Sequence, residues 1–279
     1  MQLSVVIITY NEEPNIGRTL ASVQPLVADG KGEIIVVDSG STDRTVEVAK
    51  AYGAKVFVEE WKGYAPQKNS AIDKAAGDWI LSLDADEEVD SELNEELTGT
   101  RGNNLLRTAG ESRLTMHQSG DLEDLKGAPV AFLVRRKNYF LGRWIKSGGF
   151  WPDSKLRLFR RATGRFEDRA VHEDVRVQGP TKLIAQGALI HHSYPSLSDY
   201  IEHMNRYSLL GAEMVVAKSK VRFSFINIVL RPLSTFVYNY FFRLGFLDGR
   251  EGLLLHLYHA VYVSWKYAKA WELSRKEPD

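Results

Sequence analysis

Residues 79–86, Trp79-Ile80-Leu81-Ser82-Leu83-Asp84-Ala85-Asp86, combine an apolar run with two carboxylates two positions apart. The run has the length and composition of a buried β-strand. Side chains two positions apart in an extended chain point to the same side, so we expect Asp84 and Asp86 to face one site. Ligands of open α/β sheets bind at the carboxyl ends of the strands, where this pair lies. Oxygen donors there favour Mg²⁺ or Mn²⁺, and a solvated acidic turn is the alternative.

The chain before this strand alternates short apolar runs with amphipathic stretches. The expected strands are residues 3–9, 33–37 and 54–58, and the expected helices are residues 15–27, 43–52 and 66–76. The apolar runs are rich in β-branched residues, as buried parallel strands require. This alternation predicts an α/β fold in which helices cover both faces of a mainly parallel sheet.

The second half of the chain has a different organisation. Residues 98–129 are polar and rich in Gly, Ser, Thr and Asn, which is typical of a loop. The expected sheet segments after it are residues 130–135, 156–159 and 183–191. From residue 197 onward the pattern predicts helices, with breaks around Arg231-Pro232 and at residues 245–252.

The composition excludes several classes of protein. A chain without cysteine has no disulfide, thiolate zinc site or cysteine nucleophile, and it fits a reducing compartment. Lys+Arg and Asp+Glu both total 36, so the bulk charge gives no support for binding nucleic acid. Thr9-Tyr10-Asn11-Glu12-Glu13 stands where a glycine-rich phosphate loop would follow the first strand, which argues against a dehydrogenase. The first ten residues lack a basic region and are expected to form a strand, not a signal peptide.

Two further candidates lie near other strand ends. Asp38 follows the second strand, where an acidic side chain of doubly wound folds commonly contacts a ribose or base. The residues after it, Ser39-Gly40-Ser41-Thr42-Asp43, also favour a tight turn. We expect Asp38 to bind a ligand and Asp43 to cap the next helix. Lys68 lies in the first turn of the third expected helix, where its cation could contact a phosphate or stay solvated.

Two clusters of ionisable residues occur later in the chain. Within Arg169-Ala170-Val171-His172-Glu173-Asp174, either Glu173 or Asp174 could accept a proton from a reacting hydroxyl. A solvated surface cluster is the alternative. His191-His192-Ser193-Tyr194 closes an expected strand, and His191 is a candidate metal ligand. Packing or hydrogen bonding is the alternative for this histidine pair.

The C-terminal stretch mixes aromatic, aliphatic and basic residues. Residues 223–246 are rich in Phe and also contain Arg231, Asn239 and Arg243. Residues 252–265 are almost continuously apolar but are shorter than the roughly 20 residues that a membrane span requires. We therefore expect interfacial helices that contact a membrane surface through aromatic and basic side chains. A helical subdomain packed on the sheet is the alternative.

Together these residues resemble the inverting family 2 glycosyltransferases of the GT-A fold, and more specifically the bacterial lipopolysaccharide core β-1,4-glucosyltransferase group. The similarity covers most of the chain. It rests on residues 5–13, 34–43, 67–86, 190–194 and 207–211, on Arg157-Leu158-Phe159 and on Val171-His172-Glu173. It implies a mixed, mainly parallel nucleotide-binding sheet flanked by helices, with a C-terminal helical, membrane-associated extension. The implied domains are a catalytic domain at 1–195 (nucleotide-sugar half 1–97, polar loop 98–129, acceptor half 130–195) and a helical region at 196–279.

The resemblance also assigns roles to positions of this sequence. Thr9, Tyr10, Asn11 and Glu12 would line the nucleotide pocket, Asp38 would bind uridine, and Lys68 would lie near the base or the diphosphate. Asp84 would contact the ribose or the metal, and Asp86 would ligate Mn²⁺ or Mg²⁺. The catalytic base would be Glu173, with Asp174 as the second candidate. His191 stays a further candidate ligand for the metal.

The reaction that the resemblance implies is a single in-line transfer of a sugar, by preference glucose from UDP-glucose, to a hydroxyl of a glycolipid such as the lipopolysaccharide core. The implied location is cytoplasmic, peripheral on the cytoplasmic face of the inner membrane, without a nucleic-acid partner. Two alternatives remain. A sugar nucleotidyltransferase would carry a Gly-rich loop with Arg and Lys in place of residues 10–13. A non-catalytic membrane-associated scaffold on a transferase fold would not need the carboxylates of Asp84, Asp86 and Glu173.

Overall fold

The computed structural model describes residues 3–99, 128–167, 174–218 and 221–275. The chain divides into two compact units. The first contains residues 1–136 and 154–191, and the second contains residues 137–153 and 192–279. The expected polar loop at 98–129 lies almost entirely outside the described residues, and the expected domain boundary after residue 195 stays a prediction.

The first unit is built on parallel strands. β1 (Leu3–Thr9) lies between β2 (Gly32–Asp38) and β4 (Trp79–Asp84), and β3 (Lys55–Val58) pairs with the outer side of β2; all three pairings are parallel. The main path of the sheet is β3-β2-β1-β4-β8-β6-β12-β5, and β7 (Arg143–Trp144) and β11 (Thr181–Leu183) also pair with β6. The added strands are β5 (Glu87–Val89), β6 (Ala131–Phe140), β8 (Asp153–Arg160) and β12 (Leu189–Tyr194). β8 runs antiparallel to β4, and β12 antiparallel to β5, so the sheet is mixed, as expected.

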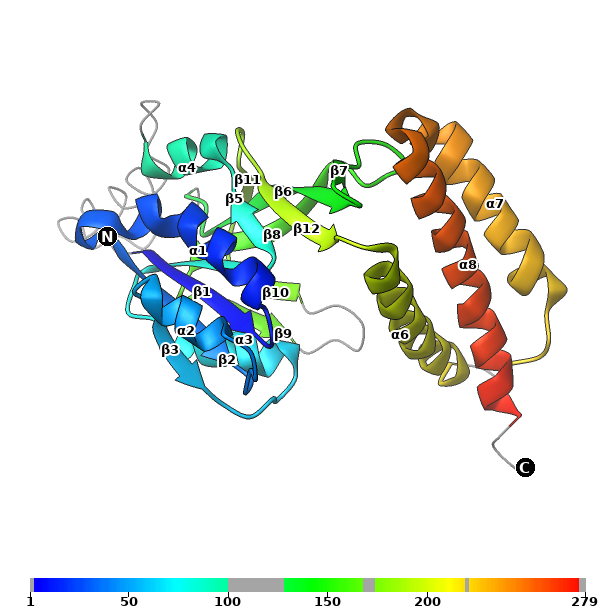
Figure 1. The fold of residues 1–279 in the computed structure, drawn as a ribbon, viewed down its shortest axis with the longest axis horizontal. Helices are drawn as coiled ribbons and strands as arrows, with labels where there is room; N and C mark the ends of the chain where they lie inside the picture. Colours follow the sequence, from blue (N-terminus) through cyan, green and yellow to red (C-terminus); the bar gives the residue numbers. More distant parts are fainter. Residues whose placement is uncertain (1–2, 100–127, 168–173, 219–220, 276–279) are drawn as a thin grey trace. The chain divides into compact units, whose positions relative to one another are not determined.

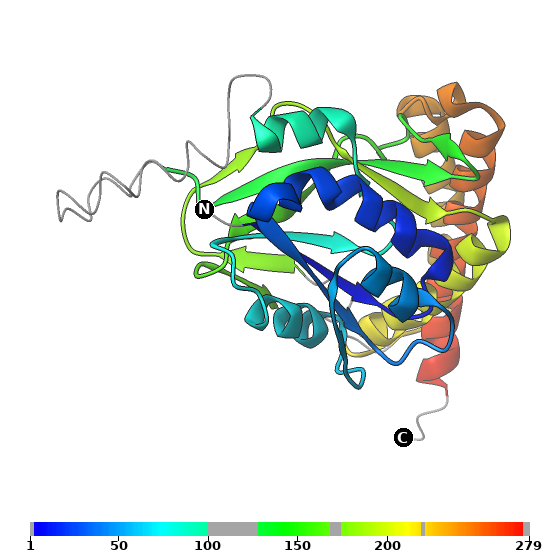
Figure 2. The same ribbon diagram turned by 60° about the vertical axis from the view of Figure 1, so that its left-hand side comes forward.

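Alternate residues of β1 pack on opposite faces of the sheet. Val5 and Ile7 belong to a core that includes Leu20 of α1 (Glu13–Val27) and the apolar residues of α2 (Thr45–Ala51) and α4 (Ser91–Thr98). Val6 belongs to the opposite core, with Ile72 of α3 (Tyr64–Asp73) and residues of β9 (Gly164–Glu167) and β10 (Asp174–Val177). Figures 1 and 2 show α1 running alongside β1. The side chains of β1 alternate between two apolar cores, so both faces of the sheet are covered by other elements of the chain. This arrangement confirms the expected α/β class.

Some local expectations need correction. The expected helix at 43–52 begins at Thr45 and its N-cap is Arg44, so the expectation that Asp43 caps it is wrong. Asp43 lies one residue earlier, where its carboxylate accepts the Thr45 backbone N–H in the turn before the helix. The expected strand at 183–191 is two short strands, β11 (Thr181–Leu183) and β12. Gly187 interrupts it with a φ of +77°, in a turn so close to α4 that a Cβ would lie 2.1 Å from the Leu93 backbone nitrogen. β5 and α4, whose N-cap is Asp90, were not predicted.

The second unit contains the C-terminal helices. α6 (Leu197–Val216) starts with a capping box between Ser196 and Asp199. The helical elements of the second unit that follow α6 are a π-helical turn (Ile226–Leu230), α7 (Arg231–Val237), a second π-helical turn (Tyr238–Phe242), a 3₁₀ turn (Gly245–Asp248) and α8 (Gly249–Ser274). Phe140, Ile145, Tyr200 and Leu255 form the core of this unit.

The expected helix break at Arg231-Pro232 is wrong. Pro232 lies in the first turn of α7, where the preceding π-helical turn passes into an α-helix and the missing N–H of proline is tolerated. The expected break at 245–252 is present as the 3₁₀ turn before α8. Among the described residues, no helix is both long enough and apolar enough to cross a membrane.

Candidate nucleotide-sugar site

The strand register places three polar side chains at one edge of the parallel sheet. Thr9 is the register partner of Asp38 in β2, and Ile8 is the partner of Asp84 in β4. The Thr9 hydroxyl donates a hydrogen bond of 2.8 Å to Oδ2 of Asp38. The carboxyl ends of β1, β2 and β4 thus converge on one place, as open α/β sheets do at their ligand sites.

Asp38 is fully buried and organises the turn after β2. Its Oδ1 accepts the backbone N–H groups of Gly40 (3.0 Å) and Ser41 (2.8 Å), and its Oδ2 accepts the hydroxyls of Ser41 (2.5 Å) and Thr9. The turn chemistry read from the sequence is therefore present. Asp38 holds the loop in shape with both of its oxygens.

The loop after β1 is fastened to the loop after β2. Asn11, at a φ of +53° that Asn tolerates better than most residues, donates its backbone N–H to the Ser41 hydroxyl (2.8 Å). Its side-chain oxygen accepts the Thr42 backbone N–H (2.8 Å). The Glu12 backbone N–H bonds the Thr45 hydroxyl (2.8 Å). These bonds define the shape of the loop that carries Tyr10, whose ring is exposed.

Glu12 lies in a field of negative charge. Burial raises the pKa of its carboxyl, a hydrogen bond from Asn15 opposes that shift, and the carboxylates of Asp86, Asp43 and Asp84 raise it further. Several carboxylates that repel one another in a partly buried site favour the binding of a cation. The loops after β1, β2 and β4 therefore form an electronegative edge.

Asp84 is held between two buried cations. Lys68 Nζ of α3 lies 2.7 Å from Oδ1, and an Arg157 Nη of β8 lies 2.6 Å from Oδ2. Burial opposes ionisation, yet Arg157 and Lys68 hold the pKa of Asp84 well below its ordinary value. Lys68 also lies 5.2 Å from the centre of the Phe166 ring. Asp84 is thus an ionised carboxylate with both oxygens engaged by charged side chains.

Arg157, Glu87 and Arg136 extend this cluster. The same Nη of Arg157 lies 2.6 Å from Oε1 of Glu87, and Arg136 lies 3.2 Å from that oxygen. Oε2 of Glu87 accepts the Asp84 backbone N–H (3.0 Å), and Glu87 is fully buried. Sequence reasoning assigned no site role to these three residues. The sequence does show Arg157 within an otherwise apolar strand, which suggests a buried cation, but it does not identify the carboxylates that Arg157 contacts.

Asp86 contacts His191 across the sheet. Its Oδ2 lies 3.3 Å from Nε2 of His191, in β12, the strand that pairs with β5. Burial opposes the charge on both groups, but their attraction lowers the pKa of Asp86 and raises that of His191. Asp86 and His191 are thus in contact, but the part of the chain that the structure describes has no cluster of three or more His, Asp or Glu positioned to hold a metal ion. The assignment of Asp84, Asp86 and His191 as metal ligands therefore stays a prediction.

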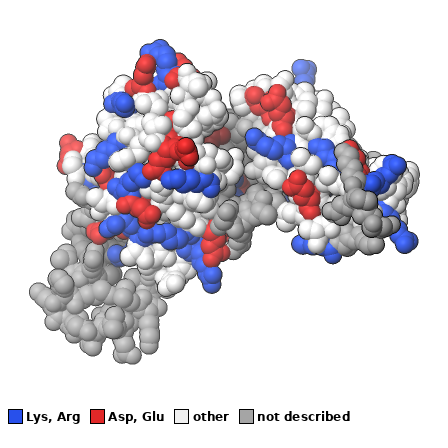
Figure 3. All heavy atoms as spheres, turned by 90° about the horizontal axis from the view of Figure 1, so that it is seen from below, with Lys and Arg blue, Asp and Glu red and all other residues white. Residues whose placement is uncertain are grey.

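The expected catalytic base, Glu173, lies outside the described residues, as does the rest of 168–173. Asp174 is described: it begins β10, is exposed and lies opposite Glu167 of β9. The choice between Glu173 and Asp174 stays a prediction. On the face drawn in Figure 3, basic and acidic side chains are interspersed, in keeping with the balanced net charge.

Comparison with known proteins agrees with this geometry. The profile of Glycosyl transferase family 2 matches residues 4–100. A glycosyltransferase of Rickettsia typhi is 31% identical over 99% of this chain and 88% of its own length. The lipopolysaccharide core biosynthesis glycosyltransferase LpsC of Rhizobium meliloti is 29% identical over 98% of this chain and 93% of its own length.

A solved structure of a known enzyme shares the fold. It is the mannosyltransferase PcManGT from Pyrobaculum calidifontis, in complex with GDP-Man and Mn²⁺, with a TM-score of 0.51 and 15% identity over 99% of this chain and 88% of that one. The GT-A type fold implied by the sequence is thus confirmed. The matched profile and the full-length relatives show that the chain belongs to glycosyltransferase family 2.

Proposed function

We propose that the protein is an inverting hexosyltransferase that moves glucose from UDP-glucose to a hydroxyl of the lipopolysaccharide core or of another glycolipid. The observation that carries this proposal is the charge arrangement at the strand ends. Asp84 lies between Lys68 and Arg157, and Asp86 lies beside His191. The similarity to LpsC over nearly the whole chain supports an acceptor of the lipopolysaccharide class, and the resemblance selects UDP-glucose.

The donor would lie over the ends of β1, β2 and β4. Tyr10 is exposed on the loop after β1, where its ring would cover a base or ribose. The roles proposed for Thr9, Asn11, Glu12 and Asp38 are to shape this pocket, since their polar atoms bond loop to loop. Lys68 and Asp84 would meet the diphosphate and ribose side of the nucleotide. A cation held by a carboxylate is well placed to receive phosphate oxygens.

A divalent ion fits Asp86 better than Asp84. Both oxygens of Asp84 face cations, whereas Asp86 offers a carboxylate beside an imidazole. Mg²⁺ and Mn²⁺ sites in nucleotide enzymes commonly use one or two protein ligands, with water and phosphate oxygens completing the shell. Asp86 and His191 would therefore hold Mn²⁺ or Mg²⁺, with Asp84 as an outer contact. When bound, the ion supplies charge neutralisation for the departing diphosphate.

The proposed chemistry is a single displacement at the anomeric carbon. The acceptor oxygen forms the new glycosidic bond as the bond to the diphosphate oxygen breaks, and UDP leaves with the electron pair. Glu173 takes the proton of the acceptor hydroxyl, with Asp174 as the second candidate. Attack from the face opposite the leaving group inverts the configuration. Lys68 would stabilise the negative charge of the leaving group.

A glycolipid acceptor is presented at a membrane surface, so we propose a peripheral location on the cytoplasmic face of the inner membrane. The exposed aromatic and aliphatic side chains between α6 and α8 support this proposal.

The experiment that tests the donor site is a thermal-shift titration of the full chain with UDP, GDP and ADP, with and without Mn²⁺. The wild type should be stabilised selectively by UDP in the presence of Mn²⁺, because a ligand that binds only the folded state raises its stability. Asp86→Ala should lose the metal-dependent part of the shift. A folded wild type that no nucleotide stabilises would overturn the transferase proposal and favour the scaffold.

A further inference from the structure

The helical segment at residues 222–247 is apolar on two sides. On one side Pro232 is buried, and the Ile228 carbonyl accepts a hydrogen bond of 2.8 Å from the Ser264 hydroxyl of α8. Phe236 stacks on Tyr240 at 5.2 Å, on the same packed side. This side belongs to the packed interior of the second unit.

The other side carries large apolar residues in the open. Ile226 is 65% exposed, Leu233 58% and Phe242 75%, and Leu230, Phe241 and Leu247 are also exposed. Ile226, Leu230 and Leu233 are spaced by four and three residues, so they form one stripe along consecutive helical turns. Phe241, Phe242 and Leu247 add exposed apolar surface toward the end of the segment. A helix that is apolar all round is normally buried all round, and extended apolar surfaces on soluble domains mark contact sites. The segment therefore has one face that the chain itself leaves uncovered.

The charges of the segment identify what covers this face. Residues 221–247 contain no Asp or Glu, and their charged residues are Arg222, Arg231 and Arg243, all exposed. In a symmetric contact between two copies the same patch would face itself, so that arginines would approach arginines without an acidic partner. An anionic lipid surface supplies the missing negative charge.

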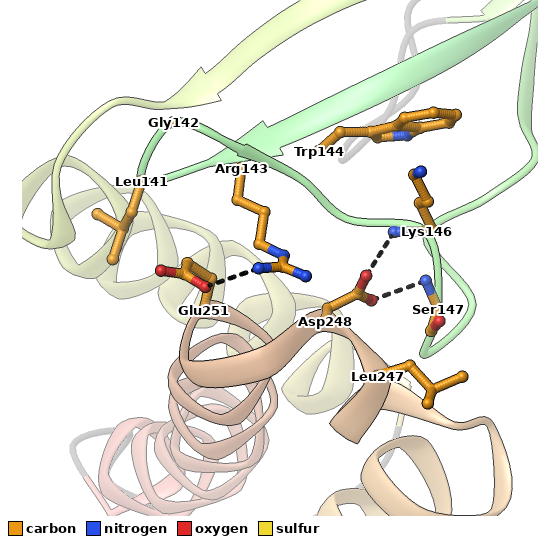
Figure 4. A pocket seen from close by; sticks show the side chains of 9 residues that line it. All are labelled: Leu141, Gly142, Arg143, Trp144, Lys146, Ser147, Leu247, Asp248 and Glu251. Carbon is orange, nitrogen blue, oxygen red and sulfur yellow. Dashed lines mark hydrogen bonds and ion pairs between the residues drawn. The ribbon is translucent and has the colours of Figure 1, made fainter.

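The segment ends at a hollow that is lined by Arg143, Lys146 and Trp144 and also by two carboxylates (Figure 4). Glu251 is paired with Arg143 at 3.6 Å, and Asp248 accepts backbone N–H groups, so Lys146 is the cation left for a ligand. Leu247 lines the hollow and is the last exposed apolar residue of the segment. On the facing loop, Lys146 Nζ lies 4.4 Å from the centre of the Trp144 ring. Buried Asp248 fixes that loop by accepting the backbone N–H groups of Lys146 (3.1 Å) and Ser147 (2.8 Å). Trp beside Lys is the pairing that anchors proteins at the headgroup level of a bilayer.

We propose that residues 222–247 dock on an anionic phospholipid bilayer, with the exposed apolar side chains in the acyl boundary and Arg222 and Lys146 at the headgroup phosphates. The segment lies in the interface and does not cross it, in keeping with the absence of a membrane-crossing helix among the described residues. This inference rests on the proposed membrane location and is independent of the proposed transfer chemistry.

The test is flotation of the full chain with vesicles of phosphatidylcholine alone or with 30% phosphatidylglycerol, a composition on the order of that in anionic membranes. The wild type should bind the anionic vesicles at least about tenfold more tightly than the neutral ones, and high salt should reduce the difference. Leu233→Ser/Phe242→Ser should lose binding to the anionic vesicles by about tenfold or more, because the two exposed apolar side chains that would enter the bilayer are removed. Val58→Ser, at an equally exposed apolar residue of β3, is the matched control and should bind as the wild type does.

A second pair of variants keeps the test independent of the apolar change. Arg222→Gln and Lys146→Gln should each weaken binding to anionic vesicles by about fivefold and leave binding to neutral ones unchanged. Failure of the wild type to float with anionic vesicles would overturn the proposal. A wild type that is a dimer, does not bind vesicles and becomes a monomer in Leu233→Ser/Phe242→Ser would also overturn it. The exposed face would then be an interface with a second copy of the chain. The flotation assay contains no nucleotide, so its result does not depend on the donor site. A protein that binds vesicles but is not stabilised by UDP in the thermal-shift experiment would overturn only the transferase proposal.

Discussion

Lys68 Nζ and Asp84 Oδ1 lie 2.7 Å apart, with the lysine side chain only 4% exposed. A buried lysine is stable only beside a negative charge, so this contact ties α3 to the end of β4. Arg157 occupies the other oxygen of Asp84. The carboxylate therefore stays ionised throughout the physiological pH range, and the cations beside it are fixed in position for an anionic ligand.

Removing Arg157 should destabilise the fold. Arg157→Met leaves Asp84 and Glu87 in a buried place without the cation that both contact. We expect the free energy of unfolding to fall by about 3–5 kcal/mol, measured by urea denaturation. Arg176→Met, which removes an exposed arginine paired with Glu167, should leave the free energy of unfolding almost unchanged. Equal losses in the two variants would show that the buried cluster has no special role.

Asp86 should matter for turnover far more than for stability. Asp86→Ala removes the carboxylate that we propose to ligate the metal, so transfer from UDP-glucose should fall by about 10²–10³-fold or more. The rate is measured by UDP release at saturating Mn²⁺. Asp29→Ala, an 83% exposed carboxylate beside Lys31, should keep the wild-type rate. A normal rate in Asp86→Ala would place the metal elsewhere.

The base assignment predicts a split between binding and turnover. Glu173→Gln should lower the transfer rate by about 10²–10⁴-fold while the thermal shift with UDP and Mn²⁺ stays at the wild-type value. Asp174→Asn provides the comparison, because it changes the adjacent carboxylate in the same way. If Asp174→Asn is the variant that loses turnover, the base is one residue further along the chain.

His256 should make stability fall in acid. Burial lowers the pKa of its imidazole from 6.5 to about 4; His259 and Arg243 act in the same direction and Asp248 opposes them. The unfolded state binds the proton more tightly than the folded state does. The contribution of neutral His256 to the free energy of unfolding is therefore complete above pH 6.5 and is lost as the pH falls to about 4, by about 3 kcal/mol in all. His256→Met should flatten the dependence of urea midpoints on pH over that window. An unchanged slope would assign the acid sensitivity to other groups.

The packing of His256 predicts a steric effect at Gly148. Gly148 has a φ of +66°, and a Cβ there would lie 2.1 Å from the His256 ring. Gly142→Ala is the matched control: its φ is +79°, but nothing lies within 4 Å of the added Cβ. The control should lower the free energy of unfolding by about 1–2 kcal/mol, because alanine is strained in the left-handed backbone region. Gly148→Ala should lower it clearly more, as measured by calorimetric unfolding. Equal costs would mean that the ring moves aside freely.

Much of the first unit could be predicted from the sequence because its signals are local. The apolar run at residues 3–9 and the one that ends in Asp84 match β1 and β4 closely. A parallel sheet brings its carboxyl strand ends to one edge, and Thr9, Asp38 and Asp84 lie there. Local periodicity and the geometry of parallel strands suffice for this part.

The sequence by itself determined the strand pattern, the fold class and the edge at which the carboxylates gather. The tertiary structure alone decided which partner each carboxylate has. Arg157 reaches Asp84 across 73 residues, because β8 is the neighbour of β4, and His191 reaches Asp86 because β12 pairs with β5. Strand order depends on how the whole chain buries its apolar faces, so residues distant in sequence become partners through packing that no local pattern records.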